Sequence, residues 1–440
     1  MTKITHTQKD ILAAHKKYCR LVITEDSPSW HRLVECADGT LEYRLGAGKW
    51  KDMTTRKFIT FVRAAVQAAQ SHQIEYFAIQ APVAMLPHIL KEHDSQWILS
   101  TLAENLTLGS YQFLKYKSTK SKRKELKEIL VCGELSAAEK NAFTRGCIVG
   151  TATNLTRDIA NTSADDMTPT KLGNAAKKAV SGTTASVKVL GEKELQKLKM
   201  GLLLAVGAGT KHETQLIVME YWGAGKPKKD EKSKAKQPIV YVGKGVTYDT
   251  GGLNVKPSGH MHDMHMDMTG GATVIGAVAA AAKLKLKKNI VGIIPAAENA
   301  VSDRAMRAGD IVTAMNGKTV EVLHTDAEGR MVLADALTYS ERFNPKVVLD
   351  IATLTGAALS ALGQHASAIM TKDLKLQNTL QELGETSGDY VWPLPLWDEY
   401  QAPLKSVRAD LANIAVNFSR FGGAIEGGAF LANFAPKKTP

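Results

Sequence analysis

Five short runs of almost purely apolar residues in the second half of the chain limit its possible folds more than any other feature. They cover residues 216–219, 239–242, 290–294, 320–323 and 347–349. Helical patterns lie between them, for example at 271–284 and 331–343. Strands that are apolar on both faces belong in sheets that are covered on both sides. The pattern therefore predicts an α/β fold with a mainly parallel central sheet and helices on both of its faces.

The first 130 residues mix helical and strand patterns on a smaller scale. A helix is expected over 58–70, a strand over 76–79 and a further helix over 81–90. The length of 440 residues suggests two or three domains, at roughly 100–200 residues each. We expect a small N-terminal α/β domain over 1–150, ending in an interdomain helix at about 136–161, and a larger domain over 151–440.

The chain is basic, with a formal net charge of +12 at pH 7. Much of this excess lies in two lysine-rich tracts, at 115–127 and 226–236. Such charge runs are typical of solvated loops. The tract at 115–127 nevertheless leaves open one alternative class of function, in which the chain binds nucleic acid through its phosphates.

Nothing in the sequence predicts a membrane-bound or secreted protein. No apolar run approaches the roughly 20 residues that a membrane span needs, and the N-terminus lacks the apolar core of a signal peptide. The four cysteines form no CxxC pair, so we expect reduced thiols. These features predict a cytoplasmic protein without a membrane partner.

Carboxylates follow the apolar runs at the points where the predicted strands end. Because ligands bind beyond the carboxyl ends of parallel strands, we expect these groups to converge at one edge of the sheet. Asp326 and Glu328 belong to the short pattern D-x-E-G-R, which helix capping alone does not require. The converging acids are Asp249, Asp267, Asp326 and Glu328, accompanied by Lys244, Lys256 and Arg330.

Four carboxylates at one place repel one another unless cations neutralise them. Two divalent metal ions bridged by shared carboxylates would do so, and such a pair activates a water molecule and polarises a carbonyl group. Oxygen ligands suit Mg²⁺ or Mn²⁺, whereas Zn²⁺ fits better if a nitrogen ligand joins. Lys244 is the candidate nitrogen ligand, because nearby cations would lower its pKa towards the neutral amine.

Each of these residues also has a plainer interpretation. A single Asp at a strand end is most often a helix cap.

The stretch G-H-M-H-D-M-H-M-D-M offers a second metal hypothesis, because His260, His262 and His265 resemble the H-x-H pattern of TIM-barrel amidohydrolases. The later strand ends offer acids rather than the further histidines that such a site needs, so loop or pocket-wall positions are favoured.

Several linked motifs resemble those of the leucine aminopeptidase family, the M17 metallopeptidases. The family signature N-T-D-A-E-G-R-L corresponds to H-T-D-A-E-G-R-M at 324–331, and V-G-K-G-x-x-x-D-x-G-G is complete at 242–252. Further similar segments are N-L-T-R-D-I-A-N-T at 154–162, I-P-A-A-E-N at 294–299, R-A-G-D at 307–310 and D-I-A-T-L-T-G-A at 350–357. The resemblance covers about residue 150 to the end.

This resemblance implies a dimetal aminopeptidase that removes N-terminal residues, leucine-like ones by preference, from peptides. It implies a homohexamer and two divalent ions per subunit, Zn²⁺ or Mn²⁺, with Mg²⁺ or Co²⁺ as alternatives. Lys256 would stabilise the tetrahedral gem-diolate, and Arg330 would hold a bicarbonate ion that moves a proton. One metal would be bound by Asp249, Asp326 and Glu328, the other by Lys244, Asp249, Asp267 and Glu328. The pocket for the first side chain would be lined by Met264, Thr353, Leu354 and Gly356.

The sequence departs from the family pattern in a few places. His324 replaces the usual Asn and Met331 the usual Leu, and we expect both to tune the site at most. A Trp-containing segment and an H-x-D-I-A-G-like strand, which follow in the family, do not occur before Pro440. We expect their loss to weaken folding or assembly without removing a ligand. The alternative to a peptidase remains a nucleic-acid-binding accessory protein that uses the tract at 115–127, with or without peptidase activity.

Overall fold

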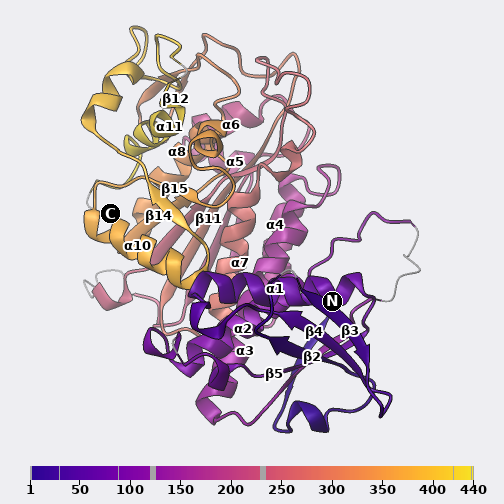
Figure 1. Cartoon of the computed structure of the whole chain (residues 1–440). Helices are drawn as coiled ribbons and strands as arrows, with labels where there is room; N and C mark the ends of the chain where they lie inside the picture. Colours follow the sequence, from indigo (N-terminus) through magenta and orange to yellow (C-terminus); the bar gives the residue numbers. More distant parts are fainter. Residues whose placement is uncertain are drawn as a thin grey trace. The chain divides into compact units, whose positions relative to one another are not determined.

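Two compact units make up the computed structural model, which describes residues 2–28, 30–87, 89–118, 125–227, 234–419, 421–437 and 439. The first unit comprises Met1–Asn154 with Glu385–Gly388, and the second comprises Leu155–Gly384 with Asp389–Pro440. The long helix α3 (Ala137–Ala160) begins in the first unit and ends in the second (Figure 1). Within the described ranges, no helix combines the length and the apolar character needed to cross a membrane.

A six-stranded sheet forms the centre of the first unit. Its strand order is β1-β6-β5-β2-β4-β3, and every pair is parallel except β3 with β4. The strands are β1 (Lys3–Thr7), β2 (Cys19–Thr24), β3 (His31–Glu35), β4 (Leu41–Gly46), β5 (Tyr76–Gln80) and β6 (Glu128–Cys132). The strand expected over 76–79 is β5, which confirms that prediction.

Helices α1 (Thr55–Ser71) and α2 (Ser95–Gly109) pack on this sheet. Thr54 caps α1 by accepting a hydrogen bond from the backbone N–H of Lys57, and apolar residues three to four positions apart then face the core. The helix expected over 81–90 is wrong. Two short 3₁₀ turns, Val83–Met85 and Ile89–Lys91, occupy that stretch, because Pro87 disfavours helical geometry at the residue before it.

The second unit contains the central sheet that the apolar runs predict. Its strand order is β14-β9-β11-β8-β7, with β10 paired to β11. β9, β10, β11 and β14 are parallel, whereas β8 pairs antiparallel with β11 and β7 pairs antiparallel with β8. The strands are β7 (Ser186–Leu190), β8 (Gln215–Trp222), β9 (Ile239–Gly243), β10 (Gly245–Asp249), β11 (Asn289–Asn299) and β14 (Val347–Ile351).

One apolar run does not join this sheet. The run at 320–323 forms β13 (Thr319–Glu321), which pairs with β12 (Ile311–Thr313) and β17 (Leu411–Ala412) in a separate three-stranded sheet. The paired strand ends at Glu321, although the backbone N–H of Val322 still donates to the carbonyl oxygen of Asp310, the residue before β12. A run of buried apolar residues therefore indicated burial correctly but not the sheet to which the strand belongs.

Helices cover both faces of the central sheet, as predicted. Successive residues of β11 point to opposite faces: Ile290 and Ile294 pack with α4 (Pro169–Ala179) and α7 (Thr269–Lys283). Val291 and Ile293 belong to the core on the other face, with α5 (Glu192–Lys197), α6 (Gly201–Gly207), α8 (Gly329–Ser340) and α11 (Gly423–Ala432).

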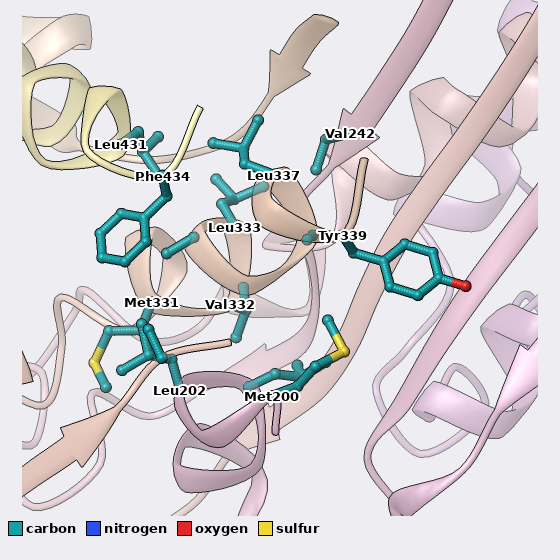
Figure 2. Close-up of a cluster of buried hydrophobic side chains, with 14 of the residues drawn as sticks. Met200, Leu202, Val242, Met331, Val332, Leu333, Leu337, Tyr339, Leu431 and Phe434 are labelled. Carbon is teal, nitrogen blue, oxygen red and sulfur yellow. The ribbon is translucent and has the colours of Figure 1, made fainter. Parts of the chain in front are cut away.

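Helix α8 lies at the centre of that second core. Figure 2 shows Met331, Leu333 and Leu337 on α8, with Met200 and Leu202 from the start of α6 on one side and Leu431 and Phe434 from the end of α11 on another. Met331 and Leu333 are fully buried. The remaining elements are α9 (Gly356–Leu362), β15 (Ser367–Ile369), α10 (Leu374–Ser387) and β16 (Val391–Pro393), with β15 and β16 paired in parallel. Because α8 is held on several sides, its first turn is a fixed platform for side chains.

Candidate metal centre

The turn between β9 and β10 carries the first residues of the predicted site. Lys244 is the single residue between these strands, which both pair with β11. The backbone is tightly packed here, because a Cβ atom added at Gly243 would lie 2.5 Å from the carbonyl oxygen of Gly270. β10 ends at Asp249, whose Oδ1 accepts a hydrogen bond of 2.8 Å from Nδ2 of Asn299. The sheet therefore fixes the backbone positions of Lys244 and Asp249.

Asp267 reaches the same place from the entry to α7. Its Oδ1 accepts hydrogen bonds from Nζ of Lys244 and from Oγ1 of Thr353, both at 2.8 Å. Thr353 follows β14, and its carbonyl oxygen accepts a second bond of 3.0 Å from Nζ of Lys244. One ammonium group thus joins the turn after β9, the start of α7 and the segment after β14.

The start of α8 contributes the other two carboxylates. Oε1 of Glu328 lies 2.9 Å from Nζ of Lys244. A Cβ atom at Gly329 would lie 2.6 Å from the same nitrogen, so glycine is needed there for the lysine to reach Glu328. The backbone N–H of Asp326 donates to Nδ1 of His324 at 3.2 Å, which fixes the loop before the helix.

Lys256 closes the cluster on its more exposed side. Its Nζ lies 2.8 Å from Oδ2 of Asp249 and also contacts the carboxylate of Asp326. One ligand atom each of Asp249, Asp326 and Glu328 lies within 4.8 Å of the others. The structure therefore brings together all the residues predicted to bind metal, together with Lys256. We call Asp249, Asp267, Asp326 and Glu328 the acidic cluster.

Burial and the repulsion of neighbouring carboxylates raise the pKa of Asp267, Asp326 and Glu328. Burial raises the pKa of Asp267 to about 8, although the ammonium group of Lys244 lowers it. Burial likewise raises the pKa of Asp326 to about 6 and also raises that of Glu328. Burial lowers the pKa of Lys244, but the surrounding carboxylates outweigh it and hold the pKa above its ordinary value. The neutral amine that the sequence suggested would need cations in the cluster.

The donor set fits divalent metal ions. Asp267 Oδ2, Asp326 Oδ1 and Glu328 Oε1 are buried and form no hydrogen bond of normal geometry, although each lies next to a lysine nitrogen. Two lysines face four carboxylates, so negative charge exceeds positive charge in a buried place. Carboxylate oxygens converging in this way, with one nitrogen nearby, are ligands that Mn²⁺, Mg²⁺ and Zn²⁺ accept.

The four predicted pocket residues differ in how they are placed relative to the acidic cluster. Thr353 contacts Asp267 directly, and Leu354 follows it. Met264 begins a short 3₁₀ turn, and its carbonyl oxygen accepts a bond of 3.3 Å from the backbone N–H of Asp267. Gly356 begins α9, and a Cβ atom added there would meet open space. Thr353 and Leu354 therefore follow the strand end at the cluster, whereas Gly356 borders open space.

The histidine-rich loop does not form the second metal site. His260 and His262 are exposed, and Nδ1 of His262 lies 3.0 Å from the carbonyl oxygen of Gly259. Among the described residues, the one group of acids, histidines or cysteines close enough to share a metal ion is Asp249, Asp326 and Glu328. The amidohydrolase hypothesis is also wrong at the level of the fold, because the central sheet is open and mixed rather than an eight-stranded barrel.

Sequence reasoning missed several side chains that hold the site. Asn299 orients Asp249, and Asn413 brackets the loop at His324 by accepting from its backbone N–H (3.2 Å) and donating to its carbonyl oxygen (2.7 Å). Glu426 pairs with Arg330. Asn299 ends the quoted I-P-A-A-E-N motif and could have been found. Asn413 and Glu426 lie in segments without a motif.

Comparison with known proteins agrees with this geometry. A model of the cytosol aminopeptidase family, catalytic domain, matches residues 154–440, and a model of the N-terminal domain of the same family matches residues 43–120. The chain belongs to the cytosol aminopeptidase family. The resemblance to the M17 peptidases inferred from the motifs is thereby confirmed.

Relatives and solved structures give the same result. A probable cytosol aminopeptidase of Alkalilimnicola ehrlichii is 42% identical over 424 residues, which cover 94% of this chain and 82% of that protein. One from Paraburkholderia phymatum is 41% identical over 396 residues, covering 89% and 75%. The bottromycin maturation enzyme BotP in complex with Mn superposes with a TM-score of 0.82 at 28% identity, covering all of this chain and 91% of that chain.

Family membership makes the chain a metal-dependent aminopeptidase, a hydrolase that acts on peptides. Its relatives carry the name of cytosol aminopeptidases. The nucleic-acid alternative gains no support from the relatives. Residues 119–124 and 228–233, within the two basic tracts, lie outside the described part of the chain.

Proposed function

We propose that this aminopeptidase uses two divalent metal ions, Zn²⁺ or Mn²⁺, to remove leucine-like residues from the N-termini of peptides. The acidic cluster carries this proposal, because four carboxylates, three of them buried, share two lysines. Asp249, Asp326 and Glu328 would hold one ion. Lys244, Asp249, Asp267 and Glu328 would hold the other. When bound, the pair supplies Lewis acidity and an activated water.

Lys256 is the proposed electrophilic group. The carboxylates of Asp249 and Asp326 raise its pKa more than burial lowers it, so Nζ carries a proton at neutral pH. A fixed ammonium group can donate a hydrogen bond to the carbonyl oxygen of the scissile bond, and this bond stabilises the negative charge that develops there. Its position beside two carboxylates keeps it oriented without substrate.

The first residue of the peptide would be recognised by charge and by shape. Asp267 offers a carboxylate to a free α-amino group, which explains the need for an unblocked N-terminus. Thr353 fixes this carboxylate through its hydroxyl group. Leu354 supplies an apolar wall that suits a leucine-like side chain, and Met264 and Gly356 would complete the pocket.

Further parts of the proposal rest on the family resemblance. We propose a homohexamer in the cytoplasm, with residues 1–150 as an N-terminal domain and 151–440 as the catalytic domain. The match of an N-terminal-domain model to residues 43–120 supports this division. The resemblance also places a bicarbonate ion at Arg330.

The first experiment removes metal with a chelator and restores it. Hydrolysis of leucine amide should fall to background after chelation and return with Mn²⁺ or Zn²⁺, and bound metal measured by mass spectrometry should reach two ions per chain. Activity that survives complete metal removal would contradict the metal mechanism. A plateau at one ion would contradict the paired-metal site. Hydrolysis of acetylated leucine amide at the same rate would contradict recognition of the amino group.

A further inference from the structure

Arg330 is buried beside the acidic cluster but does not pair with it. It lies in the first turn of α8, and its side chain is 6% exposed. Its Nη1 donates to the carbonyl oxygen of Asn413 at 2.7 Å and to Oε1 of Glu426 at 3.0 Å. Glu426 lies on α11 and is 12% exposed. The charged partner of this arginine is thus a carboxylate of the chain itself.

Close packing fixes the pair against α11. A Cβ atom at Gly427 would lie 3.6 Å from Nη2 of Arg330 and 3.0 Å from Cδ2 of Leu354. The guanidinium group and the proposed pocket residue Leu354 therefore share the small space above one glycine. A change in the position of Arg330 would therefore also change the position of Leu354 in the proposed pocket.

The electrostatics explain why a partner is required. The guanidinium group of Arg330 is almost entirely buried, and Glu426 is its ion-pair partner. A buried cation without a partner is strongly unfavourable. A free oxyanion that bound to the same guanidinium group would bring a second negative charge close to Glu426, and two like charges in a buried place repel each other.

We propose that Glu426 occupies, from within the chain, the place beside Arg330 that the motif resemblance assigned to a bicarbonate ion. The enzyme then needs no free oxyanion there. Glu426 acts as a positioning residue that holds Arg330 beside Glu328 and Leu354. This inference rests on the proposed peptidase function.

The test uses the full-length, metal-loaded enzyme in buffers depleted of carbonate. Leucine amide hydrolysis by the unchanged protein should alter less than about twofold when bicarbonate is added. Glu426→Ala should lose roughly 10- to 100-fold in kcat, the usual effect of losing a partner of this kind. Bicarbonate or formate should restore much of this loss, because a small oxyanion can occupy the space left by the carboxylate. Chloride at equal ionic strength should not.

A binding measurement supplies a readout that does not depend on turnover. Bicarbonate should raise the Tm of Glu426→Ala but not that of the unchanged protein, because only the variant has an anion site to fill. The matched control is Glu321→Gln. Glu321 is a buried carboxylate 3.0 Å from Nη1 of Arg408, and its loss should not create a response to bicarbonate.

The outcomes separate the two proposals. Stimulation of the unchanged enzyme by bicarbonate, or a Glu426→Ala variant that keeps full activity, would overturn the role of Glu426. So would a variant that is folded but gains nothing from any oxyanion in either assay. Absence of hydrolysis by the metal-loaded unchanged protein would instead overturn the proposed peptidase function, while the Tm comparison would still report on the anion site.

Discussion

The two units of the chain use similar sheets in different ways. Both contain a largely parallel sheet packed with helices. In the first unit, Glu128 at the start of β6 accepts a hydrogen bond of 2.9 Å from Thr5 and lies 3.8 Å from Nζ of Lys17. In the second unit, Asp267 and Glu328 share one lysine and are almost completely buried. The α/β architecture is common to both, and the placement of charge differs.

This difference shows where the chemistry resides. A carboxylate such as Glu128, which is hydrogen-bonded to a hydroxyl group and lies close to a lysine, contributes to structure and has no need of a metal ion. A group of acids that outnumbers its cations in a buried place provides binding energy for a metal ion. An α/β sheet does not by itself define a function, whereas the residues at its strand ends do.

The largest expected effect comes from removing one shared carboxylate. Glu328→Gln should reduce kcat/KM for leucine amide by more than about 100-fold, since even residues that only support ligands contribute 10- to 100-fold. Metal content should fall at the same time. The matched control is Glu128→Gln in the first unit, which should leave kcat/KM unchanged within about twofold. Near-full activity of Glu328→Gln would show that Glu328 does not hold metal.

Lys256→Ala should produce the next largest effect. Loss of one preorganised donor typically costs about 10²–10³ in kcat, and metal content should remain at that of the unchanged protein. Lys127→Ala provides the control, because Lys127 pairs with Glu75 on the surface of the first unit. A loss of bound metal as large as the loss of kcat would assign Lys256 to the structure of the site instead.

A smaller effect should appear in the pH dependence of stability. Asp335 on α8 accepts hydrogen bonds from the backbone N–H groups of Leu203 (3.0 Å) and Met315 (2.8 Å). Burial nevertheless raises its pKa from 3.8 to about 7. A carboxyl group whose pKa is raised on folding stabilises the folded state most below its unfolded pKa, and this contribution is lost as pH rises to about 7.

The stability difference between the unchanged protein and Asp335→Asn should therefore shrink as pH rises from about 4 to about 7. Thermal unfolding at several pH values measures it, and the comparison cancels the other titrating groups. A difference that is constant with pH would mean that Asp335 keeps its ordinary pKa. In the first unit, where Glu128 is paired and its pKa is lowered, Glu128→Gln should show the opposite trend at acidic pH.

Much of the second unit could be predicted because its signals are local. The run at 239–242 and the residues after it specify both a buried strand and the position of Lys244 and Asp249. The run at 320–323 led to the correct helix start, where Asp326 and Glu328 lie, although the strand itself belongs to another sheet. Position along the chain was therefore easier to predict than pairing, which depends on long-range contacts.

The supporting residues could not be predicted in the same way. Asn413 and Glu426 contact Arg330 across 83 and 96 residues of sequence. An isolated Asn or Glu in a loop or helix carries no periodicity and no motif. The helix expected over 81–90 does not form for a different reason: Pro87 opposes helical geometry at the residue before it, and the apolar pattern does not reveal this local effect.

The glycines around Lys244 limit how this enzyme can diversify. Side chains at Gly243, Gly270 and Gly329 would collide with the backbone or with Lys244 itself. Libraries for directed evolution that vary these positions would consist mainly of proteins that cannot assemble the site. Gly356, where a side chain would meet open space, and the exposed loop at His260 and His262 tolerate change. New substrate preferences are therefore accessible at Gly356 and in this loop, while the three glycine positions around Lys244 admit almost no variation.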